Sequence, residues 1–346
     1  MSWQQHLLDW YHQNGRAYPW RSSKDPYRVW LSEIILQQTR VQQGLPYYHR
    51  FLERFPTVED LAAATEEEVL KSWQGLGYYS RARNLHHTAQ KIVTDYGGRF
   101  PKNFESLRAL KGVGDYTASA IASICYNLPH AVVDGNVFRV LTRYYGIETP
   151  INTSQGFRQI KALASKLLRG HDPGQFNQAL MDFGAHHCTP KKPLCGDCPF
   201  QKNCVAYTTQ NVAKLPVKKG KTAVRKRYLH FLVVQTPHQT TALEQRTQKG
   251  IWHKLFQFPL LETNDETLPP QENIYHAITH FADQPQGLLL VNPEPLIHLL
   301  SHQKLHIYFW QATVQNIHTH EVALKTLSEY PVPVVLEKFM ANFFNL

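Results

Sequence analysis

The chain has 346 residues, 42% of them hydrophobic, and a formal net charge of +10 at pH 7. This length suffices for two ordinary domains, and the hydrophobic content excludes a disordered chain. The basic excess favours a polyanionic partner such as nucleic acid, although charge alone also fits an ordinary basic protein. No apolar run reaches the ~18 residues that span a membrane. The first residues carry no secretory signal, so we expect a cytosolic, bacterial protein without a membrane partner.

Residues 1–20 begin with an amphipathic helical pattern that ends near Gly15. A Tyr-Pro-Trp-Arg turn follows, in which Pro19 fixes one backbone dihedral and Arg21 is placed to face a DNA phosphate. The alternative is a packed Trp20 next to a surface arginine.

A second helical pattern runs from about Pro26 to Gln43 and contains one acidic residue, Glu33, with apolar neighbours three and four positions away. Partial desolvation would raise the pKa of this carboxyl and let it keep a proton near neutrality, as a general acid requires. A glutamate at the edge of a solvated face is the alternative. One turn later, the uncharged amide of Gln38 suits a group that enters a base stack or bonds a base edge.

Residues 47–72 are predicted to form two scaffold helices, followed by a loop rich in glycine and tyrosine at residues 75–84. This loop combines a permissive backbone with aromatic and basic side chains. Leu76 and Tyr78 could wedge into a duplex while Arg81 holds a phosphate. A structural turn with buried tyrosines is the alternative.

Two helical patterns meet at Lys111-Gly112-Val113-Gly114, before an apolar helix predicted from about Thr117 to Tyr126. The two glycines permit a tight turn whose backbone can approach another molecule closely. The turn amides and the N-terminus of the next helix would form an anion site suited to a DNA phosphate, with Lys111 beside it. An ordinary connection between helices is the alternative.

Asp134 emerges after the apolar helix, between an apolar pair and Gly135, and Asn136 follows. The hairpin, the apolar helix and this aspartate together resemble the helix–hairpin–helix with a Gly/Pro-rich segment and an aspartate that is found in DNA base-excision glycosylases.

Four cysteines lie close together in the sequence, with the spacing Cys-x6-Cys-x2-Cys-x5-Cys. In a chain without export signals this set indicates a metal or iron–sulfur site, not a disulfide framework. Four-cysteine zinc sites commonly use two short pairs. The uneven spacing instead resembles the [4Fe–4S] loop of endonuclease III-like glycosylases, where the cluster is a staple that presents a basic loop to phosphate. The predicted ligands are Cys188, Cys195, Cys198 and Cys204.

Residues 206–227 are basic without any acidic residue and are predicted to be a linker that could run along DNA. From Tyr228 the hydrophobic period changes to two, which indicates strands and an α+β domain that resembles the Nudix fold. The residues after Pro259 lack the clustered Arg and Glu of a pyrophosphohydrolase, so a DNA reader is the better interpretation. The predicted elements are strands at 231–234, 241–245 and 306–310 and a last helix near 336–344.

Together these motifs resemble the MutY-type adenine DNA glycosylases over nearly the whole chain. The resemblance implies a mostly α glycosylase domain with an iron–sulfur loop and a smaller α+β, Nudix-like domain that recognises the lesion. The implied boundaries are 1–205 for the glycosylase domain (a six-helix module at about 26–132, and an iron–sulfur part from 1–25 and 133–205), 206–227 for the linker and 228–346 for the Nudix-like domain.

This family excises adenine mispaired with 8-oxoguanine or guanine in double-stranded DNA. The resemblance implies that neutral Glu33 protonates the flipped purine at N7 while ionised Asp134 stabilises an oxocarbenium-like sugar. Asn136 would position water or Asp134. Tyr116 stands where bifunctional members carry a Schiff-base lysine, so we expect a monofunctional enzyme without robust lyase activity.

The family's contact with 8-oxoguanine corresponds to Leu300-Ser301-His302, in which Ser301 and His302 keep the polar pair and Leu300 departs from an aromatic residue. A monomer is expected. Two alternatives stay open: an endonuclease III-like bifunctional glycosylase/lyase and a non-catalytic iron–sulfur DNA-binding protein. The predicted DNA contacts are Arg21, Gln38, Leu76, Tyr78, Arg81, Lys111, Gly112 and Gly114.

Overall fold

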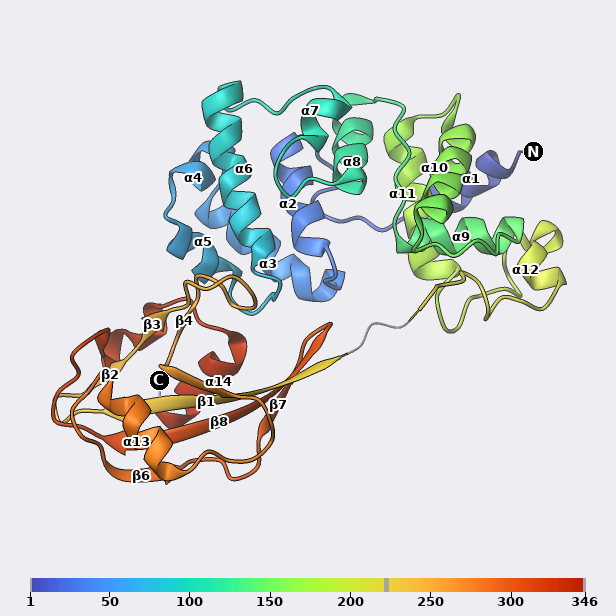
Figure 1. Cartoon of the computed structure of the whole chain (residues 1–346). Coiled ribbons are helices and arrows are strands. Elements are labelled where there is room, and N and C mark those ends of the chain that lie inside the picture. The colour runs from blue at the N-terminus through green and yellow to red at the C-terminus, as the bar shows by residue number, and fades with distance from the viewer. Residues whose placement is uncertain (1, 221–223, 345–346) are drawn as a thin grey trace. The chain divides into compact units, whose positions relative to one another are not determined.

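The computed structural model describes residues 2–220 and 224–344, so Lys221 of the predicted linker lies outside the described residues. Two compact units are present (Figure 1), and their boundary does not follow the chain order. One unit contains Met1–Ala63 and Asn84–Gly220, and the other contains Ala64–Arg83 and Lys221–Leu346. The sequence did not predict that residues 64–83 would pack with the C-terminal region. Across the described residues, no helix is long and apolar enough to cross a membrane.

One part of the first unit is a helical group with a shared core that includes Leu7, Val140 and Phe176. Leu7 comes from the N-terminal helix, so the first residues of the chain complete a core built mainly from residues 131–183. Helices begin at side-chain caps such as Ser2, whose hydroxyl accepts from a first-turn amide. The helices of this group are α1 (Trp3–Asn14), α9 (Gly135–Tyr145), α10 (Ser154–Leu168) and α11 (Pro173–Asp182).

The other helical group packs α2 against α3 and α8, and α7 against α8. The helix predicted from Pro26 to Gln43 was too long. It ends at Leu36 because the next residues turn, with Gln38 at a φ of +56°, before a new helix starts at Val41. The helices here are α2 (Pro26–Leu36), α3 (Val41–Arg54), α4 (Val58–Ala63), α6 (Ser80–Tyr96), α7 (Phe104–Arg108) and α8 (Asp115–Tyr126).

Short helical segments follow α11 and carry the cysteine loop. They are η1 (Phe183–His187), η2 (Gln201–Asn203) and α12 (Val205–Thr208). Residues 206–227, predicted to be a linker throughout, include the end of α12 and the start of the first strand.

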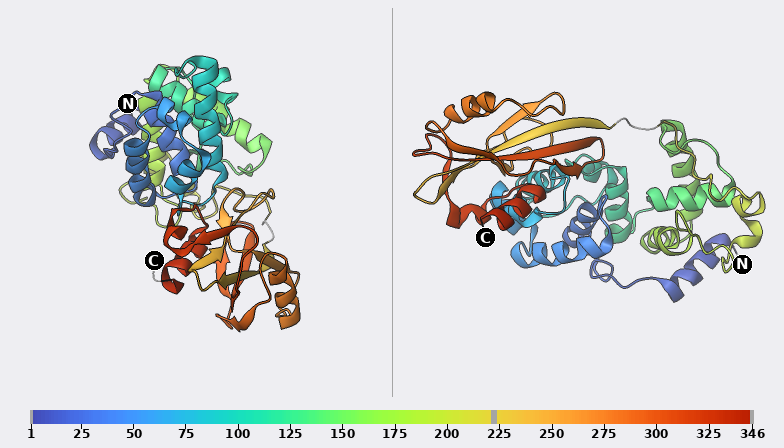
Figure 2. Two further views of the ribbon diagram at one scale, coloured as in Figure 1. Left: turned by 90° about the vertical axis from the view of Figure 1, so that its left-hand side faces the viewer. Right: turned by 90° about the horizontal axis from the view of Figure 1, so that it is seen from below.

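The second unit is built on a mixed sheet with the strand order β5-β1-β8-β6, and β7 also pairs with β8. Because successive side chains of a strand point to opposite faces, β1 divides its apolar residues between two layers. Leu232 packs in a core with Ile274 of α13, while Phe309 of β8 stacks on Phe339 of α14 at 3.6 Å between ring centroids. The two helices therefore cover opposite faces of the sheet (Figure 2).

The mostly helical first part and the α+β second part confirm the predicted fold class. The strand predicted at 241–245 is interrupted at Leu243, and α13 was not predicted because its apolar positions are few and polar residues surround them. The elements of this unit are α5 (Glu66–Trp73), β1 (Arg225–Gln235), β2 (Thr240–Ala242), β3 (Glu244–Gln245), β4 (Phe256–Gln257), β5 (Leu260–Thr263), α13 (Gln271–Thr279), β6 (Gln286–Leu290), β7 (Leu296–Leu299), β8 (Gln303–Thr313), β9 (Glu321–Ala323), η3 (Leu324–Glu329) and α14 (Val334–Phe343).

Candidate active site

Glu33 is buried in α2, with 8% of the residue exposed. Burial raises the pKa of its carboxyl to about 7. A hydrogen bond with Tyr116 and the positive charge of Arg21 lower this pKa, and the negative charge of Asp134 raises it. Burial outweighs the lowering contributions, so a substantial fraction of Glu33 is protonated at neutral pH.

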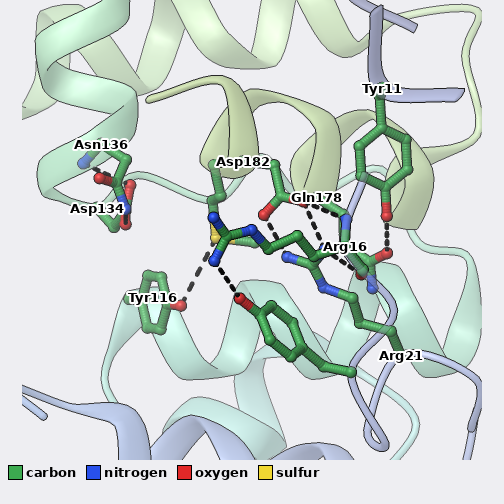
Figure 3. A network of polar contacts seen from close by, with 10 residues as sticks. Tyr11, Arg16, Arg21, Tyr116, Asp134, Asn136, Gln178 and Asp182 are labelled. Carbon is green, nitrogen blue, oxygen red and sulfur yellow. Dashed lines mark hydrogen bonds and ion pairs between the residues drawn. The ribbon is translucent and has the colours of Figure 1, made fainter. Parts of the chain in front are cut away.

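Tyr116 lies in the first turn of α8, two residues after the hairpin glycine Gly114. Its hydroxyl contacts Met181 Sδ at 3.6 Å, and burial together with the charge of Glu33 raises its pKa well above the usual value. The hydroxyl therefore stays protonated and can donate to Glu33. Figure 3 shows Tyr116 near the polar network described below.

Asp134 is the N-cap of α9, where its carboxylate is held by several donors. Oδ1 accepts from the backbone amides of Asn136 at 2.9 Å and Val137 at 2.8 Å, and Oδ2 accepts from Asn136 Nδ2 at 2.7 Å. Burial raises the pKa of Asp134, while these hydrogen bonds and the charge of Arg139 lower it. Hydrogen bonds of this kind favour the ionised form, and they fix the direction in which the carboxylate points.

Arg21 lies elsewhere than predicted. Instead of facing outward, its guanidinium makes an ion pair with Asp182 at the end of α11, and the two side chains are only 14% and 4% exposed (Figure 3). Arg21 Nη1 lies 2.5 Å from Asp182 Oδ2 and also donates to Arg16 O at 2.9 Å. The buried carboxylate is the better partner, so in this structure Arg21 is an interior charge that acts on Glu33 and is not an exposed phosphate contact.

Asp182 is a site residue that sequence reasoning missed. It is an acidic residue at the end of a helix that is otherwise largely buried, and this pattern is a weak indication available in the sequence. Its partner comes from a segment 161 positions earlier in the chain. Only the folded structure shows that pairing.

A chain of hydrogen bonds joins Asp134 to the cysteine loop. Asn136 donates to Asp134, and Asn136 Oδ1 accepts from Arg139 Nη2 at 2.8 Å. Arg139 Nε in turn donates to the carbonyl oxygen of Cys188 at 2.6 Å. The orientation of the Asp134 carboxylate is therefore coupled to the conformation of this loop.

The four predicted ligands lie in one loop, none of them forms a disulfide, and their sulfurs are close enough to affect the pKa values of Cys195 and Cys198. Burial, with the other three sulfurs nearby, raises the pKa of Cys198 to about 12, and the Phe200 amide bonds its sulfur. Arg143 Nη1 donates to Cys188 Sγ at 3.4 Å. Among the described residues no three His, Cys, Asp or Glu side chains form a site for a single metal ion. Thiolate ligands with amide and guanidinium donors around them fit an iron–sulfur cluster.

The hairpin before α8 has the predicted tight turn. Gly112 has a φ of +78°, and a Cβ there would lie 2.8 Å from the Cβ of Asn84, so only glycine fits. Gly114 has an ordinary φ of −85° and is the N-cap of α8 without a side-chain cap. A Cβ at Gly114 would meet no described atom within 4 Å. Lys111 is exposed beside the turn, as an external anion contact requires.

Residues 75–81 differ in part from the prediction. Tyr78 is 47% exposed with a φ of +49°, as a side chain directed outward requires. Leu76 and Arg81 are 6% and 8% exposed. Arg81 donates to the carbonyl oxygens of Leu76 and Gly77 and lies over the ring of Trp73. Arg81 therefore stabilises the loop from inside, and in this conformation Leu76 is not presented as a wedge.

Gln38 is a further predicted DNA contact. Like Tyr78, it is exposed and has a positive φ. A non-glycine residue in this backbone region carries strain, and such strain is frequent where a side chain is presented to a ligand.

Ser301 and His302 are exposed at the turn between β7 and β8. The hydroxyls of Ser301 and Tyr78 are hydrogen-bonded to each other. Both line a cavity of about 600 Å³ within the second unit, whose wall also includes Trp252. The predicted lesion-contact pair and the exposed tyrosine are thus brought together.

Comparison with known proteins is consistent with this geometry. Residues 31–182 match the HhH-GPD superfamily of base excision DNA repair proteins. Residues 188–204 match the iron–sulfur binding domain of endonuclease III, and residues 230–342 match the NUDIX domain. These matches confirm the [4Fe–4S] cofactor and the Nudix-like character of the second domain.

Curated relatives extend over both domains. The adenine DNA glycosylase of Buchnera aphidicola from Schizaphis graminum is 37% identical over 290 residues, which cover 80% of this chain and 83% of the relative. The mouse adenine DNA glycosylase is 35% identical over 355 residues, covering 86% and 68%. A solved thermostable thymine-DNA glycosylase is 32% identical with a TM-score of 0.56, covering 60% and 95%. The chain therefore belongs to the adenine DNA glycosylase family.

Proposed function

We propose that this protein hydrolyses the N-glycosidic bond of adenine that is mispaired with 8-oxoguanine or guanine in double-stranded DNA. The observation that carries the proposal is the pairing of a buried Glu33, with a pKa of about 7, and a hydrogen-bonded Asp134 around one site. The protein would act as a monomer in the bacterial cytoplasm, at the chromosome.

Glu33 is the proposed general acid. An adenine inside the duplex is inaccessible, so it must first leave the base stack. Protonated Glu33 would then donate to N7 of the purine and make it a better leaving group. The Tyr116 hydroxyl would orient Glu33, because it keeps its own proton and can hydrogen-bond the carboxyl.

Asp134 is the proposed stabiliser of the sugar. As the purine leaves, the sugar gains positive charge, which an ionised carboxylate stabilises at close range. Asn136 would keep Asp134 in position and Arg139 would keep Asn136 in position, through the hydrogen bonds described above.

The cluster site is proposed to have a supporting role. When bound, a [4Fe–4S] cluster would staple the loop of Cys188 and Cys204 and keep its intervening basic residues, Lys191 and Lys192, toward phosphate. Hairpin amides at Gly112 and Gly114, with Lys111, would hold a second phosphate, while Gln38 and Tyr78 would enter the base stack.

The decisive experiment is single-turnover cleavage of duplexes that hold adenine opposite 8-oxoguanine, guanine or thymine. Strand scission only after alkali is expected for the first two duplexes, because a monofunctional enzyme leaves an abasic site. Scission without alkali at an equal rate would favour a bifunctional lyase. DNA binding without any excision would favour the non-catalytic iron–sulfur protein.

A further inference from the structure

Lys161 on α10 joins three segments of the first unit through its ammonium group. Nζ donates to Asp115 Oδ1 at 2.5 Å, to Ser119 Oγ at 2.9 Å and to the carbonyl oxygen of Ala131 at 2.7 Å. An ammonium carries three donors, so these contacts satisfy all of them. The Lys161 and Asp115 side chains are 21% and 27% exposed, which leaves the pair only partly hydrated.

Asp115 occupies a sensitive position, because it is the first residue of α8 and directly follows the N-cap Gly114. Gly114 provides no side-chain hydrogen bond to the first-turn amides. A carboxylate at this end of a helix is attracted to the same amides that bind a phosphate. Asp134 shows the attraction from the N-cap position of α9, one position earlier in the helix than Asp115, where one carboxylate oxygen accepts from two first-turn amides. Asp115 is therefore an internal competitor for the anion site of the hairpin.

We propose that Lys161 is a charge-compensating positioning residue, which holds the Asp115 carboxylate away from the α8 amides and neutralises it so that a DNA phosphate can bind there. This inference rests on the proposed function, because it assumes that the hairpin contacts DNA. It names a residue outside the hairpin that sets the affinity of the hairpin for phosphate.

Among the described residues that contact Lys161, none carries a positive charge that could replace its ammonium group. Phe104 lies 5.9 Å from Nζ and stacks on His130 at 4.3 Å between ring centroids. Burial and the charge of Lys161 lower the pKa of His130, so this imidazole is neutral at physiological pH. Two partners of Lys161 are close in sequence to proposed active-site residues. Tyr116 directly follows Asp115, and Ala131 lies three residues before Asp134.

The test compares Lys161→Met with Lys166→Met, which removes an exposed lysine from the same helix. Methionine keeps much of the aliphatic stem and removes the charge. The Kd for a mispaired duplex is measured by fluorescence anisotropy at low and at physiological salt. We expect Lys161→Met to raise Kd about tenfold at low salt, and Lys166→Met to raise it less than about twofold, because an uncompensated carboxylate next to a phosphate is repulsive.

Asp115→Asn separates compensation of charge from packing. In the Lys161→Met background it should return Kd to within about twofold of wild type, since the neutral amide no longer repels phosphate. Asp115→Asn alone should bind DNA as well as wild type does, and it remains informative if Lys161→Met folds poorly. Equal loss of affinity in Asp115→Asn and Lys161→Met, or equal affinity of the Lys161 and Lys166 variants, would overturn the inference. A wild-type protein that binds no DNA would instead overturn the proposed function.

Discussion

At the scale of single residues, Glu33 shows how burial produces a carboxyl that keeps a proton near neutral pH. The helical pattern alone indicated apolar neighbours, and the folded chain adds the hydroxyl of Tyr116 and the charges of Arg21 and Asp134. These partners hold the carboxyl where it exchanges a proton near neutral pH. Burial also makes Glu33 costly for the fold, because the ionised carboxylate is poorly solvated there.

Glu33→Gln is therefore expected to lose activity and gain stability. Excision should fall by about 10²- to 10⁴-fold, because the general acid is removed. The folded protein keeps a proton on Glu33 that the unfolded chain releases between pH 4.5 and about 7, so the free energy of unfolding decreases as pH rises through this window. The decrease is on the order of 3 kcal/mol and remains in full above pH 7. Chemical denaturation at pH 8 should show the variant to be more stable than wild type.

The control for this variant is Glu53→Gln, which changes an exposed glutamate on α3. It should alter neither the excision rate nor the pH dependence of stability. In the wild type, the single-turnover rate should decline about tenfold per pH unit above the pKa of Glu33. A rate that keeps rising from pH 7 to pH 9 would show that a protonated Glu33 is not required.

Tyr116 offers a test of the proposed monofunctional chemistry. Tyr116→Lys places a primary amine on the first turn of α8 next to Glu33, so borohydride should trap a covalent adduct with DNA that wild type does not form efficiently. Lys111→Ala in the same background identifies the reacting amine, because the adduct should persist if the introduced amine forms it. Strong trapping by the wild-type protein would contradict monofunctional chemistry.

At the scale of elements, Asn177 on α11 fixes the segment that leads to Asp134. Its Oδ1 accepts from the Val132 amide at 3.0 Å, and its Nδ2 donates to Ser123 Oγ and to the His130 carbonyl oxygen at 2.9 Å each. The residue is 1% exposed, so water does not replace these bonds. A single amide thus connects α11, α8 and the connector between α8 and α9.

Asn177→Leu is expected to destabilise the protein by about 3 kcal/mol, because it leaves buried donors and acceptors without partners. Thermal denaturation measures the loss, with Asn14→Leu at the exposed end of α1 as the control. Excision at a temperature where the variant stays folded should also decrease, since the path to Asp134 is less constrained. A variant with wild-type stability would mean that the connector is held by packing alone.

Arg143 connects segments at the cysteine loop, as Asn177 does at the connector before Asp134. It is 3% exposed, and besides Cys188 Sγ it donates to the carbonyl oxygens of Thr189, Pro190 and Leu215. Lysine keeps the charge but not the planar fork that reaches several acceptors at once. The same guanidinium therefore ties the start of the cysteine loop to the segment at Leu215, which follows the loop.

Arg143→Lys should make the cluster more labile. We expect about 2–4 kcal/mol lower stability and faster loss of visible absorbance when an iron chelator is added. Arg158→Lys, at an exposed position of α10, serves as the control. Iron per chain and absorbance that match the control would show that the thiolates hold the cluster without this arginine.

Sequence reasoning succeeded where a local pattern is sufficient and failed where partners come from distant segments. Glu33, the turn at Gly112 and the cysteine spacing each express a constraint within one short stretch. The Arg21–Asp182 pair depends on the packing of the N-terminal segment against α11, and no local pattern encodes it. Arg81 was predicted to face outward for a different reason: its acceptors are nearby in sequence, but the turn that directs the carbonyl oxygens of Leu76 and Gly77 toward it forms only in the folded loop.

At the scale of the whole molecule, the residues proposed for the chemical step and those proposed for lesion recognition lie in different units. Glu33 and Asp134 belong to the first unit, while Ser301 and His302 belong to the second. Residues 64–83 pack in the second unit but are flanked in sequence by helices of the first. The cavity with Tyr78 and Ser301 in its wall therefore lies within the second unit, although its lining residues come from two distant parts of the chain.

This division predicts that recognition of the base opposite adenine can be lost without loss of the chemical step. In Ser301→Ala/His302→Ala, single-turnover excision should slow about tenfold opposite 8-oxoguanine and change little opposite guanine, because the lost hydrogen bonds are specific to the oxidised base. Thr326→Ala, a polar side chain in η3 of the same unit, is the control. Equal slowing on both duplexes would mean that the pair supports the fold or general DNA binding. If both rates, and therefore the ratio between the two duplexes, were unchanged, recognition of the lesion would belong to other residues of the cavity. Tyr78→Phe would then be the next variant to measure, since it removes the hydroxyl bonded to Ser301.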